Sequence, residues 1–159
     1  MALFNLTELA GLLGRNARLL GIDPGRKTLG LALSDTRRVL ASPYGRLRRG
    51  KLMAVAGEIA AIARKEGVGG LVVGLPLEMD GTFGPAAQAA RDWAGDLSAA
   101  TRLPAMMWDE RMSSVSANRF LVEQADLSRA KRAEAVDRLA ASVILQAALD
   151  ALSGSALAG

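Results

Sequence analysis

Three carboxylate positions in the sequence have the residue types and the surroundings for metal chemistry. Asp23 ends one short apolar run, and the pair Asp109-Glu110 ends another. Asp137 lies in a predicted helix and, at about 100° per residue, projects in the same direction as the apolar residues of that helix. Because the ends of parallel strands converge at one edge of a sheet, these acids are candidates for a common site.

A cluster of carboxylates of this kind favours a hard divalent cation. Like charges raise the pKa values of an empty cluster, whereas one or two Mg²⁺ or Mn²⁺ ions hold all of its members ionised. Such a site suits the hydrolysis of a phosphodiester. One metal ion lowers the pKa of a water that attacks in line, and the other stabilises the leaving oxygen.

Each acid also has an ordinary structural explanation. Pro24-Gly25, directly after Asp23, suits the centre of a type II turn, so Asp23 is equally compatible with a solvated acid in a simple hairpin. A carboxylate on the apolar face of a helix loses much of its hydration unless it is paired. Asp137 is therefore either a metal ligand or a buried acid bonded to an Arg or to backbone N–H groups.

The composition narrows the chemistry further. The 159-residue chain contains no His and no Cys, which excludes an imidazole base, a Ser-His triad, His-ligated metal and thiolate chemistry. Lys and Arg number 20 against 16 Asp and Glu, and the formal net charge of +4 favours nucleic acid as a partner. No run of 18 apolar residues and no secretory signal are present, so we expect no membrane span and no membrane partner. The absence of Cys fits a reducing cytosol.

Hydrophobic periodicity and turn residues predict a mixed α/β fold. Residues 1–16 are predicted to form an N-terminal arm with a short helix capped by Thr7. The predicted strands cover 18–23, 28–34, 42–49, 71–75 and 105–109, and the predicted helices cover 51–66, 85–100, 113 or 114 to 124, and 133–152. Three successive strands followed by alternating helices and strands predict a mixed sheet with helices on both faces, in a single domain over 1–159.

Basic residues accompany the acids along the chain. Six are candidates for contacts to nucleic acid phosphates beside a metal site: Arg26, Lys27, Arg111, Arg129, Lys131 and Arg132. For each of them a solvated basic surface is the alternative. The glycine and proline residues after the strand at 71–75 are expected to shape a loop over the site.

Four blocks of the sequence together resemble the YqgF/RuvX family of Holliday-junction-resolvase-like proteins, which are named as pre-16S rRNA nucleases. The resemblance runs from about Leu19 to Asp150. The blocks are Gly21-Ile22-Asp23-Pro24-Gly25-Arg26-Lys27-Thr28-Leu29-Gly30, Val73-Gly74-Leu75-Pro76-Leu77-Glu78-Met79-Asp80-Gly81-Thr82, Asp109-Glu110-Arg111-Met112-Ser113-Ser114, and Lys131-Arg132 with Asp137, Ala140-Ala141 and Ile144-Leu145.

The resemblance implies an RNase H-like fold with a five-stranded mixed sheet of order 3-2-1-4-5. It implies that Asp23, Glu110 and Asp137 are metal-binding catalytic acids for Mg²⁺ or Mn²⁺, with Asp109 as an additional candidate. It also implies a metal-dependent endo- or exonuclease that matures the 5′ end of precursor 16S rRNA in the bacterial cytoplasm, with the ribosomal particle as a candidate partner.

Three other functions are compatible with the sequence. A Holliday-junction DNA resolvase would use the same acids, and a homodimer rather than a monomer would favour it, because a four-way junction requires two symmetric cuts. A non-catalytic RNA-binding or ribosome-assembly module would keep the basic residues without cleavage. The Asp-x-Gly motif at Asp23 also resembles the phosphate-binding hairpin of actin-like ATPases and sugar kinases, which need two such domains.

Overall fold

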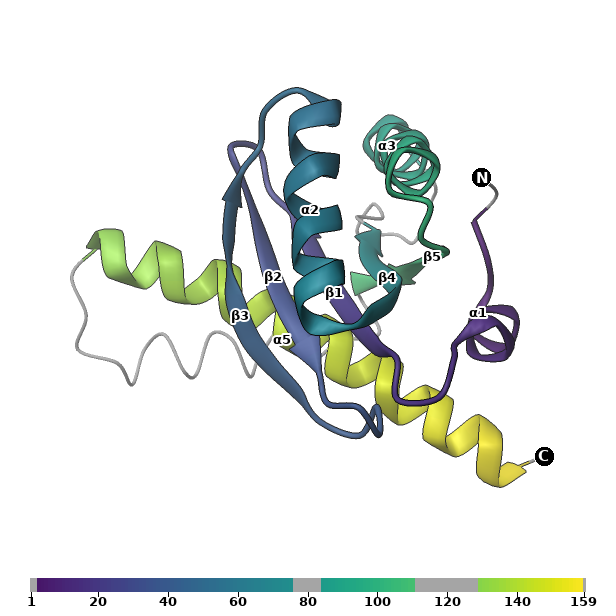
Figure 1. Ribbon diagram of the computed structural model, residues 1–159. Helices are drawn as coiled ribbons and strands as arrows, with labels where there is room; N and C mark the ends of the chain where they lie inside the picture. The colour runs from purple at the N-terminus through teal and green to yellow at the C-terminus, as the bar shows by residue number, and fades with distance from the viewer. Residues whose placement is uncertain (1–2, 76–83, 111–128, 159) are drawn as a thin grey trace.

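The computed structural model describes residues 3–75, 84–110 and 129–158, and within the last segment the side chains of 139–153. Five strands form one sheet in the order β3-β2-β1-β4-β5 (Figure 1). β1 pairs with β2, and β2 with β3, in antiparallel fashion, whereas β1, β4 and β5 are parallel. The strands are β1 (Arg18–Pro24), β2 (Thr28–Ser34), β3 (Ala41–Arg48), β4 (Val68–Leu75) and β5 (Ala105–Asp109). The strand order and the mixed pairing confirm the expected RNase H-like sheet.

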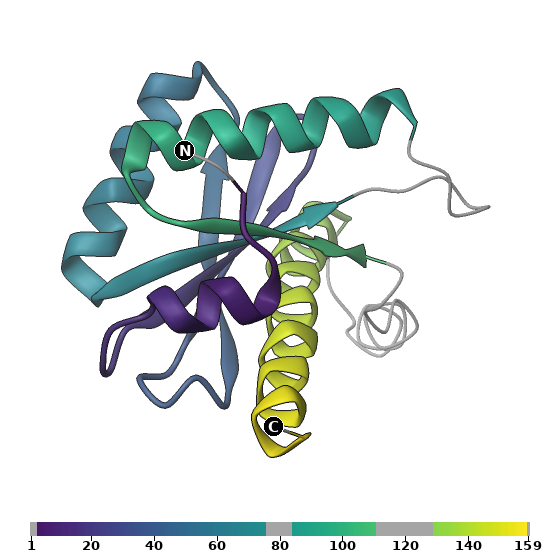
Figure 2. The same ribbon diagram turned by 90° about the vertical axis from the view of Figure 1, so that its right-hand side faces the viewer.

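Helices cover both faces of the sheet (Figures 1 and 2). α2 (Leu52–Glu66) and α3 (Pro85–Thr101) pack on one face over one cluster of buried side chains. α5 (Arg129–Ala158) crosses the other face over a second cluster, and α1 (Leu6–Leu12) contacts it. Among the described residues, no helix is both long and apolar enough to cross a membrane.

The central strands are buried on both faces, as their continuous apolar runs predict. In β1, Leu20 and Ile22 belong to the core beneath α2 and α3, whereas Leu19 belongs to the core beneath α5. In β4, Val73 belongs to the core beneath α2 and α3, and Val72 belongs to the core beneath α5. This alternation fixes which face each following residue of these strands occupies.

Gly21 allows α5 to approach β1 closely. A Cβ atom built on Gly21 would lie 2.8 Å from Cβ of Leu145 and 3.2 Å from the carbonyl oxygen of Ala141. Real Cβ atoms essentially never lie that close to another heavy atom, so any larger residue would push α5 off the sheet. The glycine therefore sets the separation between the helix and the strand that carries Asp23.

The ends of α2 and α3 follow their local signals. Gly67 ends α2 in the left-handed conformation, with φ of 70°, and its N–H donates to the carbonyl of Ala63. Pro85 opens α3 in the first turn, where its missing N–H costs nothing. Both helices and all five strands were predicted at these places, with bounds that differ by at most a few residues.

The N-terminal arm differs from the prediction in the residue that caps its helix and in its pairing with the edge of the sheet. Asn5, not Thr7, caps α1: its side chain accepts from the N–H of Glu8 at 2.8 Å, and Glu8 Oε1 accepts from the N–H of Asn5 at 3.1 Å. This reciprocal capping box positions Leu9, which is fully buried. Residues before α1 extend the sheet edge, because the N–H of Phe4 donates to the carbonyl of Ala105 at 2.9 Å.

The turn between β1 and β2 lies two residues later in the chain than the predicted type II turn on Pro24-Gly25. Pro24 is still in β1, paired with Leu29, and the N–H of Gly25 donates to the carbonyl of Thr28 at 2.9 Å. Gly25 is needed for close approach and not for a positive φ, because its Cβ would lie 2.7 Å from that carbonyl oxygen. Arg26 and Lys27 therefore form the exposed tip of the hairpin.

α5 extends beyond the predicted helix over 133–152 at both ends. Arg129, Lys131 and Arg132, predicted to precede the helix, are inside its first turns. The predicted helix over 113 or 114 to 124 and the loop after β4 lie outside the described residues, as does Arg111.

Candidate active site

The carboxyl ends of β1, β4 and β5 lie at one edge of the sheet, because these three strands are parallel. Figure 2 shows β4 and β5 ending side by side. Asp23 is the penultimate residue of β1, and Glu110 directly follows β5. The sheet therefore brings to one edge two acids that are far apart in the sequence.

Asp23 and Glu110 also lie on the same face of the sheet, the one that α5 covers. In β1, Leu19 and Gly21 contact the α5 side, and the alternation of the strand places Asp23 on that side too. In β5, Trp108 packs against the core beneath α5. Glu110, two residues later, contacts the same side of β4. The two carboxylates thus share both an edge and a face.

Gly74 makes room for Glu110 between β5 and β1. A Cβ atom built on Gly74 would lie 2.8 Å from Oε1 and 3.4 Å from Cγ of Glu110. The register that pairs Ile22 with Val73 makes Gly74 the cross-strand neighbour of Asp23. The Glu110 carboxylate therefore lies over β4, about one strand spacing, roughly 4.8 Å, from the backbone that carries Asp23.

Position 137 in α5 lies one helical turn before Ala141, whose carbonyl oxygen is 3.2 Å from the Cβ position of Gly21. On the next turn, Cδ1 of Ile144 is 3.0 Å from the Cβ position of Gly74. The helical repeat places positions 137, 141 and 144 on one stripe of α5. The stripe that packs on β1 and β4 therefore includes the position of Asp137.

Asp109 occupies the opposite face of the sheet from Glu110. Ala105 and Met107 belong to the core beneath α2 and α3, and Asp109 continues their alternation at the end of β5, opposite Leu75. The structure therefore brings Glu110, and not Asp109, together with Asp23.

Sequence reasoning missed Arg49, which holds the turn that follows Asp23. Its Nη1 donates to the carbonyl of Gly25 at 2.7 Å, and its backbone N–H donates to the carbonyl of Lys27 at 2.8 Å. Its guanidinium lies over the ring of Trp93 in α3, 5.2 Å from the centroid. An arginine at the end of the predicted strand over 42–49 offered no signal, because its partners are distant in the sequence.

The donors present at this edge fit a hard divalent cation. Asp23 and Glu110 supply carboxylate oxygens, which Mg²⁺ and Mn²⁺ prefer, and Gly74, on the strand between them, adds no side chain of its own. Within the part of the chain that the structure describes, no group of three or more Asp or Glu side chains is close enough to bind a metal ion. The side chain of Asp137 lies outside the described part of the chain.

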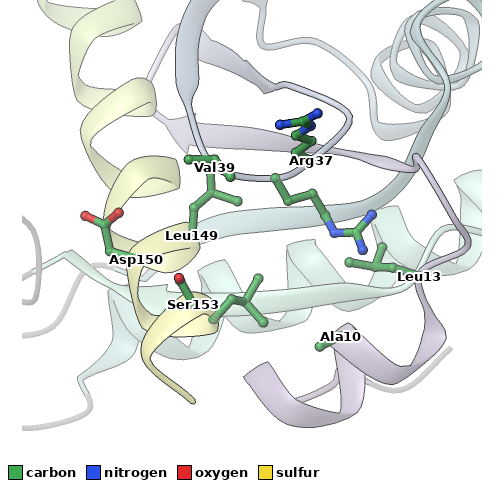
Figure 3. Close-up of a pocket in the computed structure, with 9 residues that line it drawn as sticks. Ala10, Leu13, Arg37, Val39, Leu149, Asp150 and Ser153 are labelled. Carbon is green, nitrogen blue, oxygen red and sulfur yellow. The ribbon is translucent and has the colours of Figure 1, made fainter. Parts of the chain in front are cut away.

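A pocket of about 300 Å³ lies away from these acids, between α1, the β2–β3 loop and the C-terminal half of α5 (Figure 3). Leu13, Arg38, Val39 and Leu149 are among its lining residues. Arg38 stabilises the loop there, because its Nη1 donates to the carbonyl of Ala17 at 2.6 Å. The pocket contains no pair of carboxylates and is separate from the edge that carries Asp23.

The sheet order, the helices on both faces and the acids on the α5 side define an RNase H-like protein. A family model described as "RuvX: Holliday junction resolvase" matches residues 17–151, and the chain belongs to this family. A relative from Gluconacetobacter diazotrophicus is 66% identical over 151 residues, which are 95% of this chain and 98% of the relative. Another, from Acidiphilium cryptum, is 60% identical over 153 residues, 96% of each chain. Both carry the name "Putative pre-16S rRNA nuclease".

Solved structures support the fold. RuvC from T. thermophilus, in complex with a Holliday junction substrate, superposes with a TM-score of 0.52 at 14% identity and covers 87% of this chain and 97% of its own. A second structure of Thermus thermophilus RuvC gives a TM-score of 0.51 at 15% identity, over 86% of this chain and 96% of its own. At these identities the likeness establishes the shared fold alone.

Proposed function

We propose that this protein is a metal-dependent nuclease that processes the 5′ end of precursor 16S rRNA. The observation that carries the proposal is the placement of Glu110 over Gly74, one strand away from Asp23, on the face covered by α5. The names of the relatives from Gluconacetobacter diazotrophicus and Acidiphilium cryptum supply the substrate class. Such a substrate would place the protein in the cytoplasm, with the ribosomal particle as a candidate partner.

In this proposal Asp23, Glu110 and Asp137 hold one or two Mg²⁺ or Mn²⁺ ions. A bound divalent cation supplies a water of lowered pKa and neutralises charge on the leaving oxygen. Asp23 and Glu110 approach from neighbouring strands, and Asp137 completes the set from α5. Arg26 and Lys27, at the exposed hairpin tip after Asp23, would bind phosphates that flank the scissile bond.

A DNA-junction resolvase is the second candidate, and the description of the matched family favours it. Both candidates use the same acids, and only the substrate and the oligomeric state distinguish them. A junction resolvase requires two sites, and therefore a homodimer, to make paired cuts.

The test compares two substrates with one set of variants. Purified protein is incubated with a 5′-extended 16S rRNA precursor and, separately, with a four-way DNA junction, in Mg²⁺, Mn²⁺ or EDTA. We expect cleavage of the RNA with either metal and none in EDTA. We expect Asp23→Asn and Glu110→Gln to lower the rate by more than about 100-fold, since even outer partners of metal ligands typically contribute 10- to 100-fold.

The matched control is Asp96→Asn, which removes an exposed carboxylate from α3 on the other face of the sheet. It should cleave like the wild type. Cleavage of the junction alone, by a dimer, would establish the resolvase instead. Undiminished cleavage by Asp23→Asn would refute the site, and RNA binding without cleavage in any metal would indicate a binding module.

A further inference from the structure

Exposed apolar side chains lie at the end of the sheet opposite the one that carries Asp23. In the described part of the chain, Leu12, Val39 and Leu40 are 54%, 64% and 61% exposed. They come from the last turn of α1 and from the β2–β3 loop, two segments that wall one pocket. The other large apolar side chain as exposed as these, Met53, lies apart at the start of α2. Exposed apolar side chains that gather in one place indicate an interaction site.

The pocket between these segments has an apolar lining and a fixed shape. It measures about 300 Å³ and lies between α1, the β2–β3 loop and the C-terminal half of α5 (Figure 3). Leu13, Val39 and Leu152 line it. Gln146 of α5 holds the loop, because its Nε2 donates to the carbonyl of Val39 at 2.9 Å and its Oε1 accepts from the N–H of Ala41 at 2.8 Å. A surface that is ordered before a partner binds loses less entropy on association.

The rim of this pocket carries one exposed base and one exposed acid. Arg37 and Asp150 both line the pocket, and Figure 3 shows Val39 and Leu149 between them. Among the residues that the structure describes, neither forms an ion pair, although Nε2 of Gln146 donates to Oδ1 of Asp150 at 3.0 Å. An apolar centre with opposite charges on its two sides is complementary to itself under a two-fold rotation.

The charges around the pocket favour a second copy of this chain over a strongly charged partner. Arg37 and Arg38 of the β2–β3 loop are matched in number by Asp35 of the same loop and Asp150 of α5. A strongly acidic partner would bring like charge to Asp150, and a strongly basic one would bring like charge to Arg37. A second copy turned by a two-fold rotation pairs both of these side chains at once.

We propose that this surface is the interface of a homodimer. A two-fold axis places Arg37 of each copy against Asp150 of the other, and the exposed Val39 and Leu40 of each copy pack against the pocket of the other. Because β2 is antiparallel to β1, the β2–β3 loop lies at the end of the sheet away from Asp23. The dimer therefore leaves the carboxylate edge of each copy open to substrate, and it does not depend on the proposed function.

The test is the mass of the protein in solution, measured by sedimentation equilibrium between about 1 and 300 μM, where weak specific interfaces form. We expect the average mass to rise from the 16.6 kDa of one chain toward twice that value. Arg37→Asp or Asp150→Arg alone should raise the dissociation constant at least about tenfold, because each brings like charges together twice in the interface. The double variant exchanges the two charges and should return the constant to within about threefold of the wild type.

Matched variants outside the surface make the result specific. Leu40→Ser removes an exposed apolar side chain from the surface and should weaken the dimer, whereas Met53→Ser removes an exposed apolar side chain from α2 and should not. Lys51→Asp reverses an exposed charge at the other end of the sheet and should leave the dissociation constant unchanged. Thermal melting followed by circular dichroism checks that all variants are folded.

The outcomes separate this proposal from the proposed function. A wild type of 16.6 kDa at every concentration would overturn the dimer and leave the surface to a different partner, whether or not the protein cleaves RNA. A dimer that Arg37→Asp and Leu40→Ser leave intact would use another surface, which also overturns the proposal. A dimer that both single charge reversals weaken and the exchange does not restore would overturn the two-fold pairing. A dimer that behaves as expected but cleaves nothing would support the interface and refute the nuclease.

Discussion

A Cβ atom on Gly74 would lie 2.8 Å from Oε1 of Glu110. The side chain of Glu110, which follows β5, therefore lies over the end of β4, the strand next to the one that carries Asp23. The absence of a side chain at Gly74 is thus a condition for Glu110 to occupy this place beside β1.

We expect Gly74→Ala to lower cleavage at least about tenfold by displacing Glu110, because the added methyl group occupies the position of its carboxylate. Inserting a methyl group into a packed site typically costs about 1–3 kcal/mol, so the melting temperature should also fall by several degrees. Steady-state cleavage and calorimetric Mn²⁺ binding measure the effect. Gly45→Ala is the matched control, because its Cβ would meet nothing within 4 Å. Equal activity of the two variants would contradict the role of Gly74.

The neighbouring acids Asp109 and Glu110 should behave differently, because they lie on opposite faces of the sheet. We expect Glu110→Gln to abolish Mn²⁺-dependent cleavage and Asp109→Asn to retain it within about threefold. The two variants change the same charge at adjacent positions, so each is the control for the other. A loss of cleavage in folded Asp109→Asn, with Mn²⁺ affinity lowered as well, would show that Asp109 is a metal ligand. It would contradict the conclusion that Asp109 lies on the opposite face of the sheet from the site.

Arg49 should position the turn after Asp23 without contacting the substrate. We expect Arg49→Met to lower kcat severalfold with little change in KM, because the hydrogen bond to the carbonyl of Gly25 is lost. Trp93→Leu removes the cation–π contact, worth about 0.5–1 kcal/mol at exposed sites, together with ring packing against the core beneath α2 and α3, and should mainly lower the melting temperature. If Arg49→Met instead raises KM with kcat intact, Arg49 contacts the nucleic acid directly.

Asp35 should make the β2–β3 loop sensitive to acid. The backbone N–H groups of Leu40 and Val39 donate to its carboxylate at 3.0 and 2.7 Å, and they hold the pKa of Asp35 below its ordinary value. A lowered pKa in the folded state stabilises the protein above the unfolded pKa, near 4, and that stabilisation is lost as the pH falls through the folded pKa.

The free energy of unfolding in urea, measured at pH 7 and at pH 3 or below, tests this expectation. Asp35→Asn should be less stable than the wild type at pH 7, and the difference should shrink at the acidic pH. A difference that is constant or grows on acidification would show that the carboxylate charge has no part in holding the loop.

The sequence alone determined most of the elements, because their signals are local. Apolar runs of strand length predicted β1, β2 and β4, and Gly67 and Pro85 marked helix ends through backbone conformations that their own chemistry favours. The prediction failed at the cap of α1 and at the turn after Pro24. At the cap, Asn5 satisfied the same backbone requirement two residues before the predicted position. At the turn, the pairing of β1 continues through Pro24, so Arg26 and Lys27 form the turn instead of Pro24 and Gly25.

The tertiary structure alone decided which of these residues share a surface. Nothing local distinguishes Asp109 from its neighbour Glu110, because successive residues of an extended chain differ only in the face they occupy. Which face carries the site depends on cross-strand register and on the close packing of α5 against Gly21. Contacts between residues far apart in the sequence fix both features, and they appear only when the whole sheet is assembled.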